Sequence, residues 1–228
     1  MIKNVFKELE ELNERIISCK KCPRLASYIK ELAKNKPKRY KNWNYWAKPI
    51  PGFGDINAKL LIIGLAPAAH GGNRTGRMFT GDGSGEWLVK ALYELGFANQ
   101  PVSISRDDGL LLKDVYITAS LRCAPPKNKP NRDELKNCRM YLREELSLLK
   151  NVKVVITLGR IAFENFLSIM RGKGYKIKLE FKHGENYRIG NYILIASYHP
   201  SRQNTQTGKL KWEEWLKVFK MAKENFLL

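Results

Sequence analysis

Four short apolar runs set the pattern of the chain from residue 59 onward. They are rich in Ile, Leu and Val and lack polar alternation, which is typical of strands buried on both faces of a sheet. The runs are KLLIIGL (59–65), DVYITAS (114–120), VKVVITLG (152–159) and YILIASY (192–198). Helical patterns cover 85–96, 132–149, 160–170 and about 210–226. Because strands alternate with helices, the pattern predicts a mostly parallel sheet in an α/β/α sandwich.

The segments outside this alternation predict smaller elements. Apolar residues recur at helical spacing over 3–17, and Pro23 suits the first turn of a helix over about 24–34. Residues 175–190 fit a short extra hairpin. We see no internal repeat and no boundary of a second domain, so we expect one domain over 1–228.

The chain is strongly basic, with 41 Lys and Arg against 22 Asp and Glu and a formal net charge of +19. Such a field favours polyanions, above all nucleic acid and less often an anionic membrane surface. Adaptation to high temperature is a rival explanation, although thermophilic proteins usually gain Glu alongside Lys. No apolar run approaches the ~20 residues of a membrane span, and the N-terminus lacks a signal-peptide core. We therefore expect a soluble, cytoplasmic protein.

One stretch combines basic charge with aromatic rings. Residues 34–48 include six Lys or Arg and four aromatic residues, and no acid occurs between residue 34 and Asp55. The composition predicts a loop over 34–54. Bases interleaved with aromatic rings suit phosphate contacts and base stacking. A solvated basic loop whose tryptophans pack inward explains the same pattern equally well.

The cysteines form two distant pairs, spaced C-x2-C and C-x14-C. They are Cys19, Cys22, Cys123 and Cys138. Disulfides are not expected in a reducing cytosol, and four sulfur ligands suit either zinc or an iron–sulfur cluster. Spacing does not choose between these, and it leaves open that the second pair is merely buried. A four-ligand site is structural in the first place, because it ties the helices of residues 1–35 to the middle of the chain.

Polar loops follow three of the four predicted strands. They are GLAPAAHGGNRTGRMFTGDGSG (64–85), LRCAPPKNKP (121–130) and SYHPSRQNTQTG (197–208), whereas LGRIAF (158–163) is less polar. The carboxyl ends of parallel strands meet at one edge of a sheet, where ligands bind. We therefore expect these loops to form a pocket. The first loop matches neither a Walker phosphate loop nor G-x-G-x-x-G, so nucleotide cofactors are disfavoured.

Three positions in these loops have structural as well as chemical interpretations. Asp82 or Ser84 fits the N-cap of the helix that begins near residue 85. His70 fits a hydrogen bond to a backbone group. His199 lies between an aromatic residue and a proline at a strand end, where it is held rigidly and can aim a ring N–H into the pocket, so we favour a functional role for it.

These segments closely resemble family 5 of the uracil-DNA glycosylase superfamily, the type b enzymes of thermophilic bacteria and archaea. The likeness rests on GLAPAAHGGNRTGRMFTGD, RCAPPKNKP, SYHPSRQNTQTGKL and the cysteine spacing, and it extends from CPRL at 22–25 through PIPGFGD at 49–55 to GKL at 208–210. The resemblance implies an α/β/α fold with a central four-stranded parallel sheet. It further implies that the four cysteines hold a [4Fe–4S] cluster. The implied activity is excision of uracil from DNA, together with deaminated purines such as hypoxanthine and xanthine.

The resemblance also implies roles for residues at matching positions. His199 is expected to bind the uracil carbonyl, Phe79 to stack on the base and Asp82 to supply a carboxylate, with Asn128 as a further active-site candidate. Ala68 stands where related families carry Asp, Asn or Glu to orient water, and it leaves room for the base together with Ala66. Apart from the resemblance, the basic charge of the chain suggests contacts with DNA phosphates, and the candidates are Arg74, Arg77, Arg202, Gln203, Lys209 and the 34–48 stretch.

Together these features predict a monofunctional glycosylase that flips the damaged base out of the duplex and leaves an abasic site. No lysine is marked as desolvated for Schiff-base chemistry. We expect a monomer that binds DNA, and no motif supports binding to a replication clamp. On the residues alone, a different hydrolase on this fold stays open. So does a non-catalytic nucleic-acid-binding protein with a cysteine-held metal, although that class leaves the converging loops unexplained.

Overall fold

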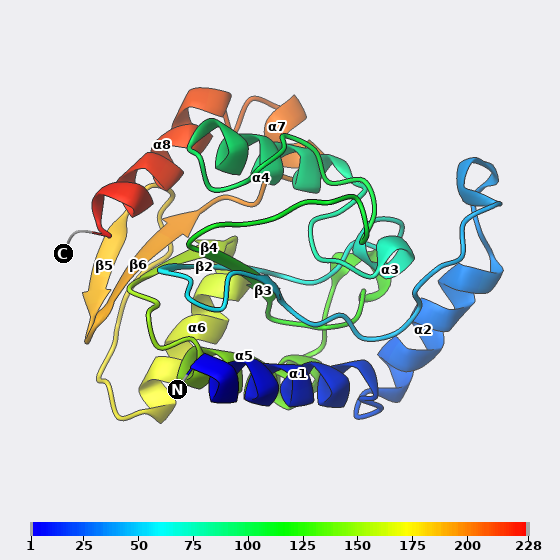
Figure 1. The fold of residues 1–228 in the computed structure, drawn as a ribbon, viewed down its shortest axis with the longest axis horizontal. Helices are drawn as coiled ribbons and strands as arrows, with labels where there is room; N and C mark the ends of the chain where they lie inside the picture. Colours follow the sequence, from blue (N-terminus) through cyan, green and yellow to red (C-terminus); the bar gives the residue numbers. More distant parts are fainter. Residues whose placement is uncertain (1, 227–228) are drawn as a thin grey trace.

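A six-stranded sheet runs through the middle of the protein (Figure 1). The structure is a computed structural model that describes residues 2–226, with side chains from residue 5. The strands are β1 (Phe53–Gly54), β2 (Leu60–Gly64), β3 (Val115–Ala119), β4 (Val154–Leu158), β5 (Asn186–Ile189) and β6 (Tyr192–Ser197). They lie in the order β1-β3-β2-β4-β6-β5.

The four central strands are parallel, which confirms the predicted α/β class and the four-stranded parallel sheet. Two short antiparallel strands, β1 and β5, extend the sheet at its edges. The hairpin expected within 175–190 is displaced, because β5 pairs with β6 across a turn at Gly190, whose φ is +56°. The two residues of β1 are too few to leave a period in the sequence.

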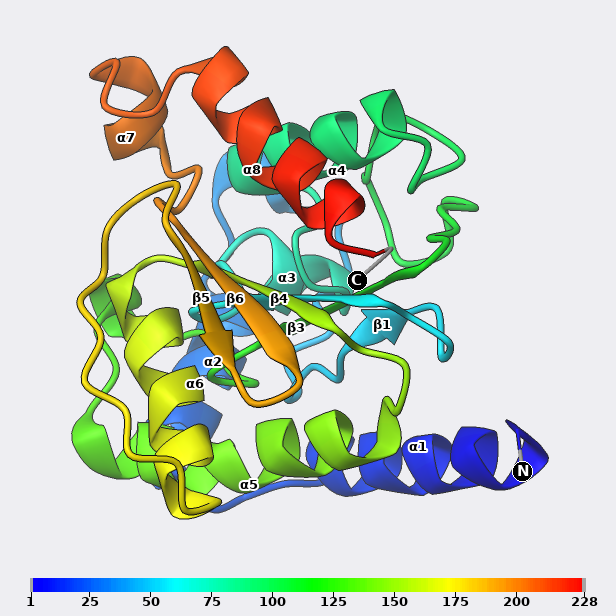
Figure 2. The same ribbon diagram turned by 90° about the vertical axis from the view of Figure 1, so that its left-hand side faces the viewer.

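Helices cover both faces of the sheet. They are α1 (Ile2–Ile17), α2 (Pro23–Lys34), α3 (Gly72–Thr75), α4 (Gly83–Glu94), α5 (Arg132–Leu148), α6 (Arg160–Gly172), α7 (Arg202–Gln206) and α8 (Trp212–Glu224), with 3-10 turns η1 (Lys38–Tyr40) and η2 (Pro126–Asn128). Figures 1 and 2 show α4 and α8 on one face and α1, α5 and α6 on the other. Each predicted helix is present, with boundaries that differ by a few residues.

Alternate residues of β2 define two separate cores. Leu60 and Ile62 pack with α4 and α8, in a cluster that includes Trp215. Leu61 and Ile63 pack with α1, α5 and α6, in a cluster that includes Phe163. All five residues of β2 are buried. This continuous apolar run is what two helical layers require of a central strand.

A buried ion pair fastens the end of β3 to α5. The Arg122 guanidinium donates to Glu145 at 2.6 Å and to the Thr118 hydroxyl at 2.6 Å. Arg122 and Glu145 are 1% and 0% exposed. Breaking a pair like this typically costs about 3–5 kcal/mol, since the remaining charge is left buried and unpaired. The pair therefore fixes the point at which the loop 121–130 leaves the sheet.

The segment after α2 projects from the molecule at the end where α3 lies (Figure 1). Residues 35–52 contain only the turn η1 as regular structure, so the loop predicted over 34–54 is confirmed apart from that turn and the short β1. Among the described residues, no helix has the length and apolar character needed to cross a membrane.

Candidate functional site

A cavity of about 640 Å³ opens at the carboxyl ends of the parallel strands. It is lined by Leu65, Ala66, Ala68, Phe79, Asp82, Ser84, Lys127, Asn128, Leu158, Gly159, Arg160, Ile161, His199, Ser201, Arg202 and Gln203. All four loops that follow a parallel strand contribute to it. The three loops singled out in the sequence therefore do converge, and the predicted base-binding and catalytic residues line one pocket.

The loop after β4 also reaches the pocket, which the sequence did not indicate. Gly159 leaves the strand with φ +95° and starts α6 directly, so Arg160 and Ile161 sit at the pocket mouth. Lys127 was likewise missed. Gly159, at the junction of a strand and a helix, could have indicated this loop. Our prediction relied instead on loops rich in polar residues, and this loop has few.

Phe79 forms one wall of the pocket and is held in an unusual backbone conformation. Its φ is +49°, in the left-handed region that non-glycine residues rarely adopt. Two glycines make room for it: a Cβ on Gly64 would lie 2.8 Å from the Phe79 ring, and one on Gly85 would lie 2.2 Å from the Phe79 carbonyl oxygen. The ring is thereby fixed 5.9 Å from the His199 ring, with an interplanar angle of 31°.

His199 lies at the start of the loop after β6, and its main chain is pinned. The His199 carbonyl accepts hydrogen bonds from the Ser201 backbone N–H and from the Asn204 side chain, both at 2.8 Å. Burial lowers the pKa of His199 to about 4. The imidazole is therefore neutral at physiological pH, with one N–H donor and one acceptor nitrogen.

Asp82 has the structural role that its sequence context allowed. Its Oδ1 accepts from the backbone N–H groups of Ser84 and Gly85, both at 3.0 Å, and so caps α4. Burial raises the pKa of Asp82, and these two donors offset part of the rise. The other oxygen lies against Gly71, where a Cβ would come within 1.9 Å of it. The carboxyl group thus caps a helix and lines the pocket at once.

Asn128 belongs to a second strained segment at the pocket rim. Lys127 and Asn128 both have left-handed φ values, +53° and +56°. Asn tolerates this conformation, whereas Lys does so at a cost of roughly 1 kcal/mol. Ala66 and Ala68 also line the pocket, and their side chains carry no polar atom. The polar atoms around the cavity therefore come from a small number of side chains and from the backbone.

Arg74 and Arg77 are turned into the protein, so the prediction that they contact DNA does not fit their positions. They are 4% and 7% exposed. Arg74 donates to the His70 carbonyl at 2.7 Å and to the Gly81 carbonyl at 2.9 Å. Arg77 pairs with Asp108 at 2.8 Å. Both guanidinium groups hold loops together, because their five donors reach several carbonyl and carboxylate oxygens at once.

The other three predicted DNA contacts are exposed. Arg202 and Gln203 begin α7 at the edge of the pocket. Lys209 follows α7, with its ammonium 4.7 Å from the centre of the Tyr198 ring. A hydrogen bond from the His70 ring to a backbone group was expected, but its Nδ1 instead lies 2.9 Å from a side-chain group, the Tyr45 hydroxyl.

The four cysteines lie in one neighbourhood, between α1, α2, α5 and the loop after β3. Burial raises the pKa of Cys123, and charges on Cys138, Cys19 and Cys22 raise it further. Burial also raises the pKa of Cys138 to about 11. The Asn137 amide donates to the Cys22 sulfur at 3.7 Å. Within residues 2–226, no group of three or more His, Cys, Asp or Glu side chains is arranged to hold a single metal ion.

Comparison with known proteins gives a consistent family. Residues 51–223 match the family described as the uracil DNA glycosylase superfamily. A type-5 uracil-DNA glycosylase of Thermus thermophilus is 47% identical, over 94% of this chain and 96% of that protein. One from Pyrobaculum aerophilum is 46% identical, over 93% of this chain and 91% of that protein. A type-4 uracil-DNA glycosylase of Sulfurisphaera tokodaii is 29% identical, over 94% and 84% of the two chains.

Proposed function

The chain belongs to the uracil-DNA glycosylase superfamily, with type-5 members among its relatives, and we propose that it hydrolyses the N-glycosidic bond of uracil in DNA to leave an abasic site. The observation that carries the proposal is the pocket at the strand ends, where a fixed aromatic ring lies beside a neutral histidine. A base inside a duplex is out of reach of such a pocket, so the base has to be flipped out, at a cost of a few kcal/mol.

Phe79 and His199 suit two different parts of base recognition, namely stacking on the ring and hydrogen bonding to a carbonyl. The Phe79 ring offers a stacking surface for the base, and Gly64 and Gly85 leave the space that this residue occupies. His199 offers an N–H donor for a base carbonyl. As the glycosidic bond breaks, negative charge grows on the departing base, and a preorganised donor at its oxygen stabilises that charge. A neutral imidazole is able to perform this role because it keeps one ring N–H donor.

We assign Asp82 to the sugar and the attacking water in the same reaction. The bond-breaking state places positive charge on the sugar ring, which a nearby carboxylate stabilises, and the same carboxylate is able to accept a proton from water. Ala68 offers no polar atom for the water, so Asn128 and Asp82 are the side chains that we assign to this task. Lys127 lines the pocket but is exposed, and we assign no covalent step to it.

The small side chains around the pocket favour a broad base preference. Ala66 and Ala68 supply no hydrogen bonds to the edge of a base, and discrimination between bases needs such bonds. Hypoxanthine and xanthine are therefore proposed as further substrates. Strong release of uracil with no release of hypoxanthine from any duplex would contradict this extension.

We also propose that Cys19, Cys22, Cys123 and Cys138 hold a [4Fe–4S] cluster with a structural role. The four thiols share one neighbourhood and come from chain segments a hundred residues apart, and an all-sulfur donor set suits iron–sulfur clusters. Held by these four residues, a cluster would tie the segment between α1 and α2 to α5 and to the loop after β3. A broad absorption band near 400 nm in the purified protein supports the cluster, whereas a colourless protein that contains zinc contradicts it.

The activity is tested by single-turnover base release from labelled duplexes that carry U·G, U·A, hypoxanthine·T or an undamaged pair. Alkali is added only after the reaction, because an abasic site breaks in alkali while intact DNA does not. Alkali-dependent cleavage at uracil is the expected result. If a folded protein binds DNA but releases no base, the catalytic proposal is wrong and the protein is a nucleic-acid-binding module.

A further inference from the structure

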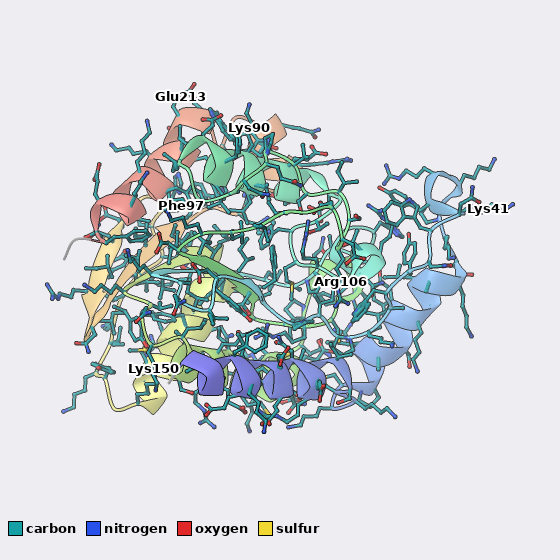
Figure 3. The ribbon with its side chains drawn as sticks, viewed as in Figure 1. Lys41, Lys90, Phe97, Arg106, Lys150 and Glu213 are labelled. Carbon is teal, nitrogen blue, oxygen red and sulfur yellow. The ribbon has the colours of Figure 1, made fainter. Side chains whose placement is uncertain are left out.

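The basic segment of residues 34–48, called the arm here, projects beyond the sheet and its helices (Figure 1). Its base is fastened to α3 by two backbone hydrogen bonds. Trp46 N–H donates to the Arg74 carbonyl and Ala47 N–H to the Asn73 carbonyl, both at 3.1 Å. Lys34, Lys38 and Lys41 are exposed, and Figure 3 places Lys41 near the far tip.

Three of the six cations of the arm lie over aromatic rings instead of beside acids. The Arg39 guanidinium is 4.7 Å from the Tyr40 ring centre, the Lys36 ammonium 5.8 Å from that of Tyr45, and the Lys48 ammonium 5.5 Å from that of Trp46. All residues of the arm are described, and none of its side chains forms an ion pair. Six positive charges are thus presented without an internal counter-charge, which favours an external polyanion.

A groove of about 310 Å³ continues this surface toward the body of the protein. It is lined by Trp43, Asn44, Trp46, Arg74, Thr75, Ser105, Arg106 and Asp107. The exposed Arg106 lies 4.7 Å from the Trp46 ring centre, and Asp107 contributes one carboxylate. The ring of Trp43 already faces Arg74 at 4.0 Å, and Trp46 packs against Gly76. Because Trp43 and Trp46 already pack against other residues of the protein, the groove favours phosphate contacts over base stacking.

The arm and the catalytic pocket are connected by one loop. The loop 64–85 supplies α3, to which the arm is bonded, and it also supplies Ala66, Phe79 and Asp82 to the pocket. We propose that the arm, with Arg106, binds the sugar-phosphate backbone of the duplex on one side of the flipped base. This inference rests on the proposed function, since it takes a base in the pocket as the point from which the flank is measured.

The test compares two variants that each remove three positive charges. The arm variant is Lys34→Gln, Lys38→Gln and Lys41→Gln. The control is Lys150→Gln, Lys153→Gln and Lys176→Gln, all exposed, with Lys150 at the opposite end of the molecule from Lys41 (Figure 3). Both are titrated, at several salt concentrations, against a labelled duplex of about 30 base pairs with a stable abasic analogue at its centre. The Kd and its salt dependence are measured.

We expect the arm variant to bind about tenfold more weakly, with a salt slope smaller by about 2 to 3, and the control to change far less. Shortening the duplex to about 4 base pairs on one side of the analogue should remove the difference between wild type and arm variant. Shortening the other side should preserve it. Equal losses in both variants, or a loss independent of either flank, overturn the proposal.

Uracil release by the wild-type protein separates the two proposals. If wild type releases no uracil but the flank effect is present, the proposed function fails while the arm stands as a DNA-binding surface. If uracil is released and the arm variant binds every duplex as wild type does, the arm inference fails alone.

Discussion

Some residues of the pocket depend on neighbours that take no part in the proposed reaction. Phe79 keeps a left-handed backbone only because Gly64 and Gly85 leave space for it. Such conformations cost of order 1–3 kcal/mol and persist where the surroundings over-determine them. The strain at Phe79 and at Asn128 therefore marks the two walls between which we place the base.

The neutral state of His199 makes stability depend on pH. Burial lowers its pKa to about 4 from 6.5, so between these values the unfolded chain binds a proton that the folded protein does not. Stability should fall as the pH decreases through this range. The drop in Tm between about pH 7 and about pH 4.5 should be larger for wild type than for His199→Gln. Equal drops contradict a buried, neutral His199.

The two roles of Asp82 can be separated by substitution. Asn accepts the same backbone hydrogen bonds and is an equally good N-cap, whereas Ala loses the cap at a cost of about 1 kcal/mol. Asp82→Asn should keep the wild-type Tm and lose base release by roughly a hundredfold or more. Asp82→Ala should lose both. Wild-type turnover in folded Asp82→Asn removes the carboxylate from the mechanism.

We expect His183 to position the loop that carries His199, a role that the sequence did not reveal. Its Nδ1 accepts from the Tyr198 backbone N–H at 3.1 Å, and its ring stacks on that of Tyr198 at 4.7 Å and 17°. It thus braces the residue before His199. In Asn the side-chain oxygen lies where Nδ1 was, so His183→Asn keeps an acceptor, while His183→Phe keeps only the stacked ring.

We expect His183→Phe to slow single-turnover base release about tenfold with little change in the Kd for DNA, and His183→Asn to retain most of the rate. Tm values of both variants serve as the control for folding. If the two variants lose the same rate in proportion to their loss of Tm, His183 is only a packing residue.

Among the elements, the loops after the strands line the pocket and were the least predictable from the sequence. The parallel strands leave continuous apolar runs and the long helices leave helical periods, so their number and their order along the chain followed from the sequence. The inward orientation of Arg74 left no signal in the sequence, because it depends on Tyr40 and Trp43, which lie more than thirty positions earlier in the chain. The Asp82 cap was foreseen since the N-cap preference is local.

Arg74 joins the arm to the catalytic loop, and its forked shape is what allows this. The guanidinium lies between the rings of Tyr40 and Trp43, at 4.3 and 4.0 Å, and bonds the carbonyl of Gly81, the residue before Asp82. A lysine ammonium lacks the planar fork. Arg74→Lys should therefore slow base release about tenfold while the net charge is kept.

Arg171→Lys, at an exposed site near the end of α6, is the matched control for this prediction. Single-turnover rates and Tm values are measured for both variants. A wild-type rate in Arg74→Lys shows that the arm and the catalytic loop are independent.

At the scale of the whole molecule, the positive charges include a buried, paired group and an exposed, unpaired group. Buried cations such as Arg122 and Arg77 are paired and organise the fold, whereas the exposed cations of the arm are not. The net charge predicted a polyanionic partner, which agrees with membership of the uracil DNA glycosylase superfamily, but two of the five residues expected to contact DNA, Arg74 and Arg77, are buried. Exposure depends on tertiary packing, which no local pattern contains.

The sheet's edges carry a consequence for association between copies of the protein. Long, regular outer strands act as templates for edge-to-edge pairing and aggregation. Here both outer positions are taken by short antiparallel strands, the two-residue β1 and the four-residue β5, and Asn186 and Arg188 on β5 are exposed. We expect light scattering to give the mass of a single 26.3 kDa chain even at high concentration. A dimer disrupted by substitution in β5 contradicts this. The short β1, which left no pattern in the sequence, and β5, which pairs differently from the predicted hairpin, thus protect the protein from polymerising through its own sheet.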